Sequence, residues 1–135
     1  MNRYKDWFDQ AKVDFEKAKS DLNNKFYEWA CFTSQQCGEK AVKSLIMKLG
    51  FTPWGHSITA LLKLISEKVE IPKEIIESAQ LLDSYYIPTR YPNGFVSGKP
   101  SDYYNEKIAK EAINAAGKIL EFCKDYIFRE KENNR

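Results

Sequence analysis

Residues 108–127 read IAKEAINAAGKILEFCKDYI, and this stretch decides the fold. Its apolar residues recur at steps of three and four, which is the spacing of one face of an α-helix. They form two neighbouring rows: Ile108, Ala112, Ala115, Ile119, Phe122 and Tyr126, and Ala109, Ile113, Ala116, Leu120, Cys123 and Ile127. One apolar row lets a helix pack against one neighbouring helix, so two rows predict a helix that packs against several others.

The rest of the chain repeats this period, and no alternating strand pattern competes with it. Further helices are predicted over residues 4–22, 25–49, 58–69 and 72–86, and a loop over residues 87–101 precedes the last helix. Together these elements predict an all-α fold, an antiparallel four-helix up-and-down bundle with an additional short helix.

Helix ends are marked by typical residues. Gly50 suits a left-handed C-terminal stop, Ser57 an N-cap and Pro72 a first helical turn, while Ser101 or Asp102 is expected to cap the last helix. We expect one helical domain over residues 1–128, followed by a polar C-terminal tail over residues 129–135 that frays.

Composition excludes several classes of protein. The 135 residues carry 21 Lys and Arg against 19 Asp and Glu, so the net charge of +2 excludes binding of nucleic acid by bulk electrostatics. Three cysteines without close pairing and a single histidine predict reduced thiols in a cytoplasmic protein, with no metal site and no cofactor. Neither a membrane span nor a secretory signal is expected. The 14% of aromatic residues suggests an apolar surface that one protomer does not bury, and hence a homodimer.

The loop over residues 87–101 is the first candidate site. It contains Arg90 and Lys99 but no acidic residue, and Tyr85 and Tyr91 lie beside or within it. Arginine offers a fixed fork of donors for phosphate, and tyrosine rings can stack on a base. The structural alternative is that the tyrosines form the edge of the core and Arg90 pairs with a carboxylate of the preceding helix.

The second predicted helix and the single histidine supply further candidates. Gln36, Lys40 and Lys43 share one side of that helix, and Glu39 lies beside them, a set that could form the wall of an anion-binding groove. A solvated face whose lysine stems cover apolar surface explains the same pattern. His56 is either a loop histidine near a helix start or a group that contacts phosphate or transfers a proton.

The ordered motifs resemble a known family. They are residues 34–45 (SQQCGEKAVKSL), Gly55-His56-Ser57, residues 83–86 (DSYY), residues 89–92 (TRYP) and the alanine-rich last helix. The whole set resembles the HEPN (higher eukaryotes and prokaryotes nucleotide-binding) domain.

The resemblance implies a bundle of four main helices and a short one, commonly dimeric. Small members of the family are often partners of a minimal nucleotidyltransferase, and others are ribonuclease toxins of toxin–antitoxin pairs. By position, Arg90, Tyr91 and Pro92 correspond to the Arg-Tyr-Pro of this branch. Gln36, Glu39, Lys40 and Lys43 correspond to its polar set on the second helix.

One departure shapes the functional prediction. The ribonuclease members carry a histidine four to six residues after the arginine, but here Gly94, Phe95 and Val96 occupy those positions. We therefore predict a non-catalytic module that binds a nucleotide or polynucleotide and partners a minimal nucleotidyltransferase. Its predicted ligand-binding residues are Arg90, Tyr91, Lys40, Lys43, Gln36, Glu39 and Tyr85.

Two alternatives remain open at this point. One is a metal-independent ribonuclease toxin that uses Arg90, His56 and Tyr91 as catalytic residues, which requires the fold to bring His56 to Arg90. The other is a helical bundle for protein interaction, whose groove binds a peptide or a helix.

Overall fold

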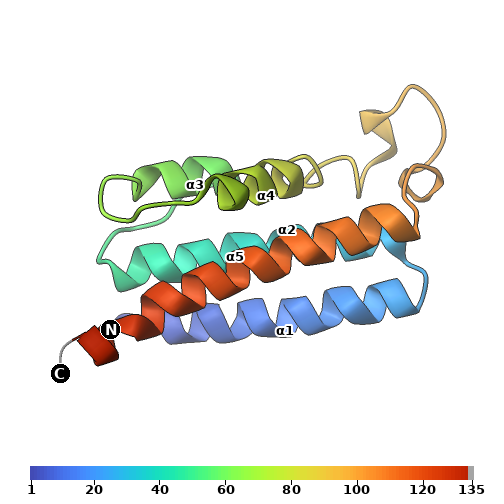
Figure 1. Ribbon diagram of the computed structural model, residues 1–135. Helices are drawn as coiled ribbons and strands as arrows, with labels where there is room; N and C mark the ends of the chain where they lie inside the picture. The colour runs from blue at the N-terminus through green and yellow to red at the C-terminus, as the bar shows by residue number, and fades with distance from the viewer. Residues whose placement is uncertain (134–135) are drawn as a thin grey trace.

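The structure is a computed structural model that describes residues 1–133 (Figure 1). Its helices are α1 (Tyr4–Asn23), α2 (Tyr27–Lys48), α3 (Ile58–Leu64), α4 (Lys73–Asp83) and α5 (Glu106–Asn133), with short 3-10 turns η1 (Pro92–Gly94) and η2 (Pro100–Asp102) before α5. There is no strand in the described chain. The four principal helices alternate in direction along the bundle (Figure 1), which confirms the predicted fold class.

α2 and α5 form the centre of the bundle. α2 contacts α1, α3, α4 and α5, and α5 contacts α1, α2 and α4, so the prediction that residues 108–127 pack against several helices is confirmed. Small residues on both helices are fully buried, among them Ala41, Ala109 and Ala116. Side chains of this size let the helix axes approach closely, and larger aliphatic groups then fill the space around them.

Gly38 lies at a closely packed point of the interior. A Cβ atom there would lie 2.9 Å from Ile58 Cδ1 and 3.0 Å from Leu82 Cδ1. Ile58 begins α3 and Leu82 lies near the end of α4, so the missing side chain of Gly38 lets both helices close onto α2.

Two of the predicted helix ends are observed. Gly50 follows α2 with a φ of +90°, and Ser57 Oγ accepts a hydrogen bond of 3.1 Å from the Ala60 amide at the start of α3. A long-range contact also stabilises the start of α3. Asp83, at the end of α4, accepts bonds from the Ile58 and Thr59 amides at 2.7 and 3.1 Å and so ties α4 to the start of α3.

The predicted cap of the last helix was wrong. α5 begins at Glu106, where Asn105 Oδ1 accepts a 2.9 Å bond from the Ile108 amide. Asp102 instead accepts from the Lys99 amide within η2. The Asp102 carboxylate is already bonded to the amide and the side chain of Lys99 at its own 3-10 turn, so it does not cap α5.

Other boundaries differ by a few residues. α3 ends at Leu64 and α4 at Asp83, both earlier than expected, because irregular turns take over while Ile65 and Val69 stay buried. α5 continues to Asn133, so most of the expected tail is helical. Residues 134–135 of that tail lie outside the described part. No helix in that part is long and apolar enough to span a membrane.

Candidate functional site

Arg90 lies in the turns that follow α4, against aromatic rings. Its Nε and Nη2 atoms donate to the carbonyl oxygen of Tyr86 at 2.9 and 2.6 Å. Its guanidinium carbon lies 4.4 Å from the ring centroid of Phe32, 4.5 Å from that of Tyr86 and 5.0 Å from that of Tyr91. No described carboxylate forms an ion pair with it. The arginine is therefore oriented by rings and by one carbonyl, and its positive charge is not neutralised by an acid.

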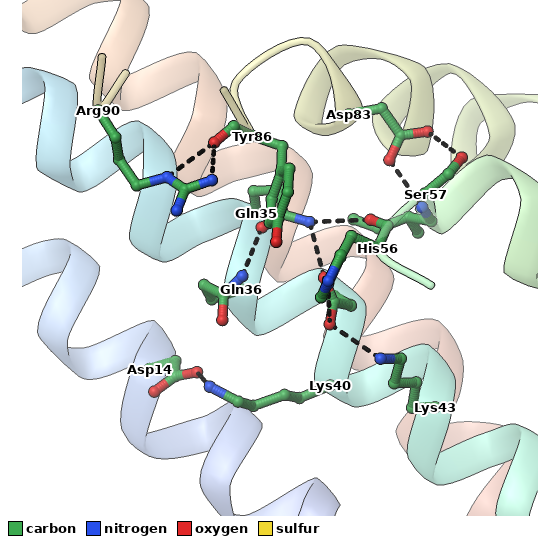
Figure 2. A network of polar contacts seen from close by, with 12 residues as sticks. Asp14, Gln35, Gln36, Lys40, Lys43, His56, Ser57, Asp83, Tyr86 and Arg90 are labelled. Atoms are coloured by element: carbon green, nitrogen blue, oxygen red, sulfur yellow. Dashed lines mark hydrogen bonds and ion pairs between the residues drawn. The ribbon is translucent and has the colours of Figure 1, made fainter. Parts of the chain in front are cut away.

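His56 reaches the same group of rings from the connection between α2 and α3. Its imidazole stacks on Tyr86 with 4.6 Å between centroids and 18° between planes. Figure 2 shows the Tyr86 ring between Arg90 on one side and His56 on the other. The fold thus brings His56 to Arg90, with one tyrosine ring between them.

These contacts define a compact group drawn from three separate segments of the chain. We call it the site cluster: Phe32, His56, Tyr86, Arg90 and Tyr91. Tyr91 is 48% exposed and the His56 side chain is 56% exposed, so the cluster opens to solvent at these two residues.

A buried polar network lies beneath His56. Nδ1 of His56 lies 3.1 and 3.3 Å from the two carboxylate oxygens of Glu39, which is only 5% exposed. Nε2 of the fully buried Gln35 donates to Glu39 Oε1 and to the carbonyl oxygen of His56, both at 3.1 Å. Gln36 Nε2 donates in turn to Gln35 Oε1 at 2.8 Å (Figure 2). Glu39 and Gln36 therefore support the histidine from within α2.

The two lysines predicted to form an anion-binding wall are already paired. Lys40 Nζ lies 2.6 Å from Asp14 Oδ2 on α1, and Lys43 Nζ lies 3.0 Å from Glu39 Oε2 (Figure 2). The Lys43 side chain is only 11% exposed. Two ion pairs at this burial leave little free positive charge on this face of α2.

Tyr85 lies away from the site cluster although it is next to Tyr86 in sequence. It is 7% exposed and meets Tyr104 edge to face, with 6.0 Å between centroids. Burial raises the pKa of its hydroxyl above the ordinary value of 10. The structural alternative considered for the tyrosines, an edge of the core, describes Tyr85 well.

The loop before α5 forms a second aromatic group. Phe95 and Tyr103 stack with 3.9 Å between centroids and 9° between planes, and the Tyr103 hydroxyl donates to the carbonyl oxygen of Ser97. Lys99 Nζ pairs with Asp102 at 2.8 Å, and this hydrogen bond raises the pKa of Lys99 and lowers that of Asp102. We call these residues the loop cluster: Phe95, Ser97, Lys99, Asp102 and Tyr103.

Sequence reasoning missed three residues of the site: Phe32, Gln35 and Tyr86. A signal was present, because Phe32, Gln35 and Glu39 follow one another at helical spacing and Tyr86 lies four residues before Arg90. What no spacing could indicate was the approach of His56, which depends on how α3 and α4 pack onto α2.

A groove lies elsewhere on the surface. It measures about 780 Å³, runs over α5, and is lined by apolar side chains of α1, α4 and α5, among them Phe15, Ile75, Ile113 and Leu120. This groove is where the protein-interaction alternative would place its peptide or helix.

Comparison with known proteins gives consistent matches over nearly the whole chain. The HEPN domain model matches residues 4–126. Among solved structures, TT1696 from Thermus thermophilus is 42% identical, with a TM-score of 0.91 and coverage of 93% of this chain and 99% of that chain. ST0689, an archaeal HEPN homologue, is 43% identical, with a TM-score of 0.81 and coverage of 94% and 99%.

Two further relatives complete the comparison. A HEPN domain protein from Thermotoga maritima is 40% identical, with a TM-score of 0.76 and coverage of 91% and 98%. A Methanocaldococcus jannaschii protein named "Putative toxin MJ1304" is 28% identical over an alignment of 127 residues, and the match covers 87% of this chain and 84% of that protein.

Proposed function

Since the chain belongs to the HEPN domain family, as its motifs suggested, we propose that it is a non-catalytic module that binds a nucleotide or an RNA at the site cluster. The observation that carries this proposal is the position of Arg90 between aromatic rings. A guanidinium held by these rings and by the Tyr86 carbonyl oxygen has lost much of its conformational freedom before a ligand arrives, which favours binding of a phosphate group.

The proposed ligand contacts are Arg90, Tyr91 and His56. Arg90 would bind phosphate through the N–H groups that Tyr86 does not use, and the exposed ring of Tyr91 would stack on a base. Gln36, Glu39, Lys40 and Lys43 are assigned a supporting role, because each already has a side-chain partner within the protein.

We further propose that the protein forms a homodimer in the cytoplasm and partners a minimal nucleotidyltransferase in a toxin–antitoxin-like pair. Family membership supports this role, as does the toxin name of the M. jannaschii relative. Sedimentation at micromolar concentration tests the dimer. Co-purification with a minimal nucleotidyltransferase encoded beside the chain tests the partner.

Isothermal titration calorimetry with ATP, GTP and a short single-stranded RNA tests the binding proposal. We expect measurable binding of at least one of these ligands by the wild type and its loss in Arg90→Ala. Absence of binding by the wild type, both alone and with its nucleotidyltransferase partner, would contradict the proposal.

A metal-independent ribonuclease is the second candidate, and the contact between His56 and Glu39 favours it. A histidine held by a carboxylate next to an arginine is a common arrangement for general acid–base chemistry. Incubation with total tRNA in the presence of a chelator distinguishes the two functions. Cleavage that disappears in both His56→Ala and Arg90→Ala would replace the non-catalytic proposal with this one.

A further inference from the structure

Glu39 is a buried carboxylate with three side-chain neighbours that carry N–H groups. Its Oε1 atom accepts from Gln35 Nε2 at 3.1 Å, its Oε2 atom accepts from Lys43 Nζ at 3.0 Å, and His56 Nδ1 lies within 3.3 Å of both oxygens. Glu39 is the acidic group that contacts the imidazole. Lys43 pairs with the same carboxylate, and Arg90 contacts the Tyr86 ring on which His56 stacks.

The orientation of Gln35 follows from its neighbours. Its Nε2 atom faces two acceptors, the Glu39 carboxylate and the carbonyl oxygen of His56, so the amide group must present its NH₂ there. Both hydrogens of that NH₂ group are then used. Gln35 thus holds the backbone of His56 in place while Glu39 holds its ring.

The tautomer of His56 follows from the same reasoning. An ionised carboxylate can only accept hydrogen bonds, so the ring nitrogen beside Glu39 must carry a hydrogen. In a neutral imidazole the other nitrogen, Nε2, then has a free lone pair. No described residue hydrogen-bonds to Nε2, and the side chain is 56% exposed.

We propose that Glu39 is a positioning residue that fixes His56 as the Nδ1–H tautomer and presents Nε2 to the ligand as a hydrogen-bond acceptor. The ligand part of this inference rests on the proposed function, whereas the tautomer itself does not. Arg90 offers donors on one side of Tyr86, and His56 offers an acceptor on the other. The site therefore takes a ligand with an anionic oxygen near Arg90 and a hydroxyl or N–H group near His56. A ribonucleotide can supply the two groups at separate positions, whereas a bare phosphate is too small to reach both sides of the Tyr86 ring.

Nitrogen-15 NMR of the imidazole tests the tautomer directly. The chain has a single histidine, so its ring signals need no assignment. Spectra are recorded at a pH high enough that the ring signals no longer change with pH, so that the neutral imidazole is observed. We expect Nδ1 to resonate as a protonated nitrogen and Nε2 as an unprotonated one, and in Glu39→Ala we expect the ring to shift toward the Nε2–H form. An Nε2–H tautomer in the wild type overturns the proposal, and this spectrum decides even if the variant does not fold.

Asp14→Asn is the matched control for the spectra. It weakens the Asp14–Lys40 ion pair, which lies on the neighbouring stretch of α2, but leaves Glu39 untouched. We expect its tautomer to equal that of the wild type. A shift as large as that in Glu39→Ala would mean that any disturbed ion pair on α2 changes the ring, and would overturn the positioning role.

A double-mutant cycle measures how Glu39 acts on the ligand. With a short RNA whose binding the wild type shows, we expect Glu39→Ala and His56→Ala each to weaken binding by roughly tenfold, the cost of one lost hydrogen bond with its orientation. Because Glu39 acts through His56, the double variant should lose no more than either single variant. Additive losses would overturn the proposal. Absence of binding by the wild type would instead contradict the proposed function and leave the tautomer to be decided by the NMR spectra.

Discussion

The site cluster and the loop cluster are both groups of stacked aromatic residues, yet they are assembled in different ways. The site cluster joins α2, the α2–α3 connection and the turns after α4, so its members meet only when the bundle is complete. The loop cluster lies within nine residues of chain, and its hydrogen bonds and ion pair close over three to six residues.

The charged groups separate the two clusters further. In the loop cluster, the positive charge of Lys99 is paired with the carboxylate of Asp102. In the site cluster, Arg90 has aromatic rings and a carbonyl oxygen around it but no acid. The tertiary contacts of the site cluster thus orient Arg90 without pairing it with an acid, whereas Lys99 of the loop cluster is paired with a nearby aspartate. We infer that the first cluster binds and the second stabilises the loop.

The largest difference between the two clusters should appear when one side chain of each is truncated to alanine. We expect Arg90→Ala to weaken RNA or nucleotide binding by about 100-fold, or about 2.7 kcal/mol, because a charged hydrogen bond and its stacking are both lost. Tyr103→Ala should change the affinity by less than about twofold, since its contacts stay within the loop. Calorimetry on both variants makes the comparison, and similar losses would mean that the loop cluster also binds ligand.

The two aspartates that accept backbone hydrogen bonds give the next effect. We expect Asp83→Ala to lower the free energy of unfolding by about 2 kcal/mol, because three donors at the start of α3 lose their acceptor. The Asp102 side chain is 48% exposed and accepts only from Lys99, so Asp102→Ala should leave the urea midpoint unchanged within error. Urea unfolding followed by circular dichroism compares them. Equal midpoints for the two variants would show that the long-range tie between α4 and α3 contributes nothing.

The smallest effect tests the rings themselves. Tyr86→Phe keeps the surface on which Arg90 and His56 stack, so we expect less than about a twofold change in affinity, whereas Tyr86→Ala should cost about tenfold. Tyr103→Phe removes the bond to Ser97 and should affect only the protection of loop amides in hydrogen exchange. A large loss in Tyr86→Phe would indicate that the hydroxyl, rather than the ring, contacts the ligand.

Much of the fold could be predicted because it is encoded in local periods. The rows of residues 108–127, the glycine stop at Gly50 and the N-cap at Ser57 depend only on neighbours within a turn or two of helix. The cap of α5 could not be chosen in the same way. Several polar residues precede that helix, and which of them reaches the free amides depends on the 3-10 turn that Pro100 begins.

The site was predictable in its members more than in its arrangement. Arg90 and Tyr91, which the sequence predicted to bind ligand, contact each other in the site cluster, and His56, named as an alternative catalytic residue, stacks on Tyr86 in the same cluster. Their binding of a ligand stays a prediction. Lys40 and Lys43 share a helix face as the spacing indicated, but a helical period carries no information about the acids on other elements, such as Asp14 on α1. The partners of His56 could not be predicted either, because its contacts with Glu39 and Tyr86 depend on how α3 and α4 pack against α2.

The space left by Gly38 has a consequence for the site as well as for the core. Gly38 precedes Glu39, and it touches Ile58 two residues after His56 and Leu82 four residues before Tyr86. The close packing at Gly38 therefore helps to set the distance between the Glu39 carboxylate on α2 and the rings of His56, just before α3, and Tyr86, just after α4. A larger residue at position 38 would push α3 and α4 away from α2. The site would then widen from inside the protein, although the substituted residue does not contact the ligand.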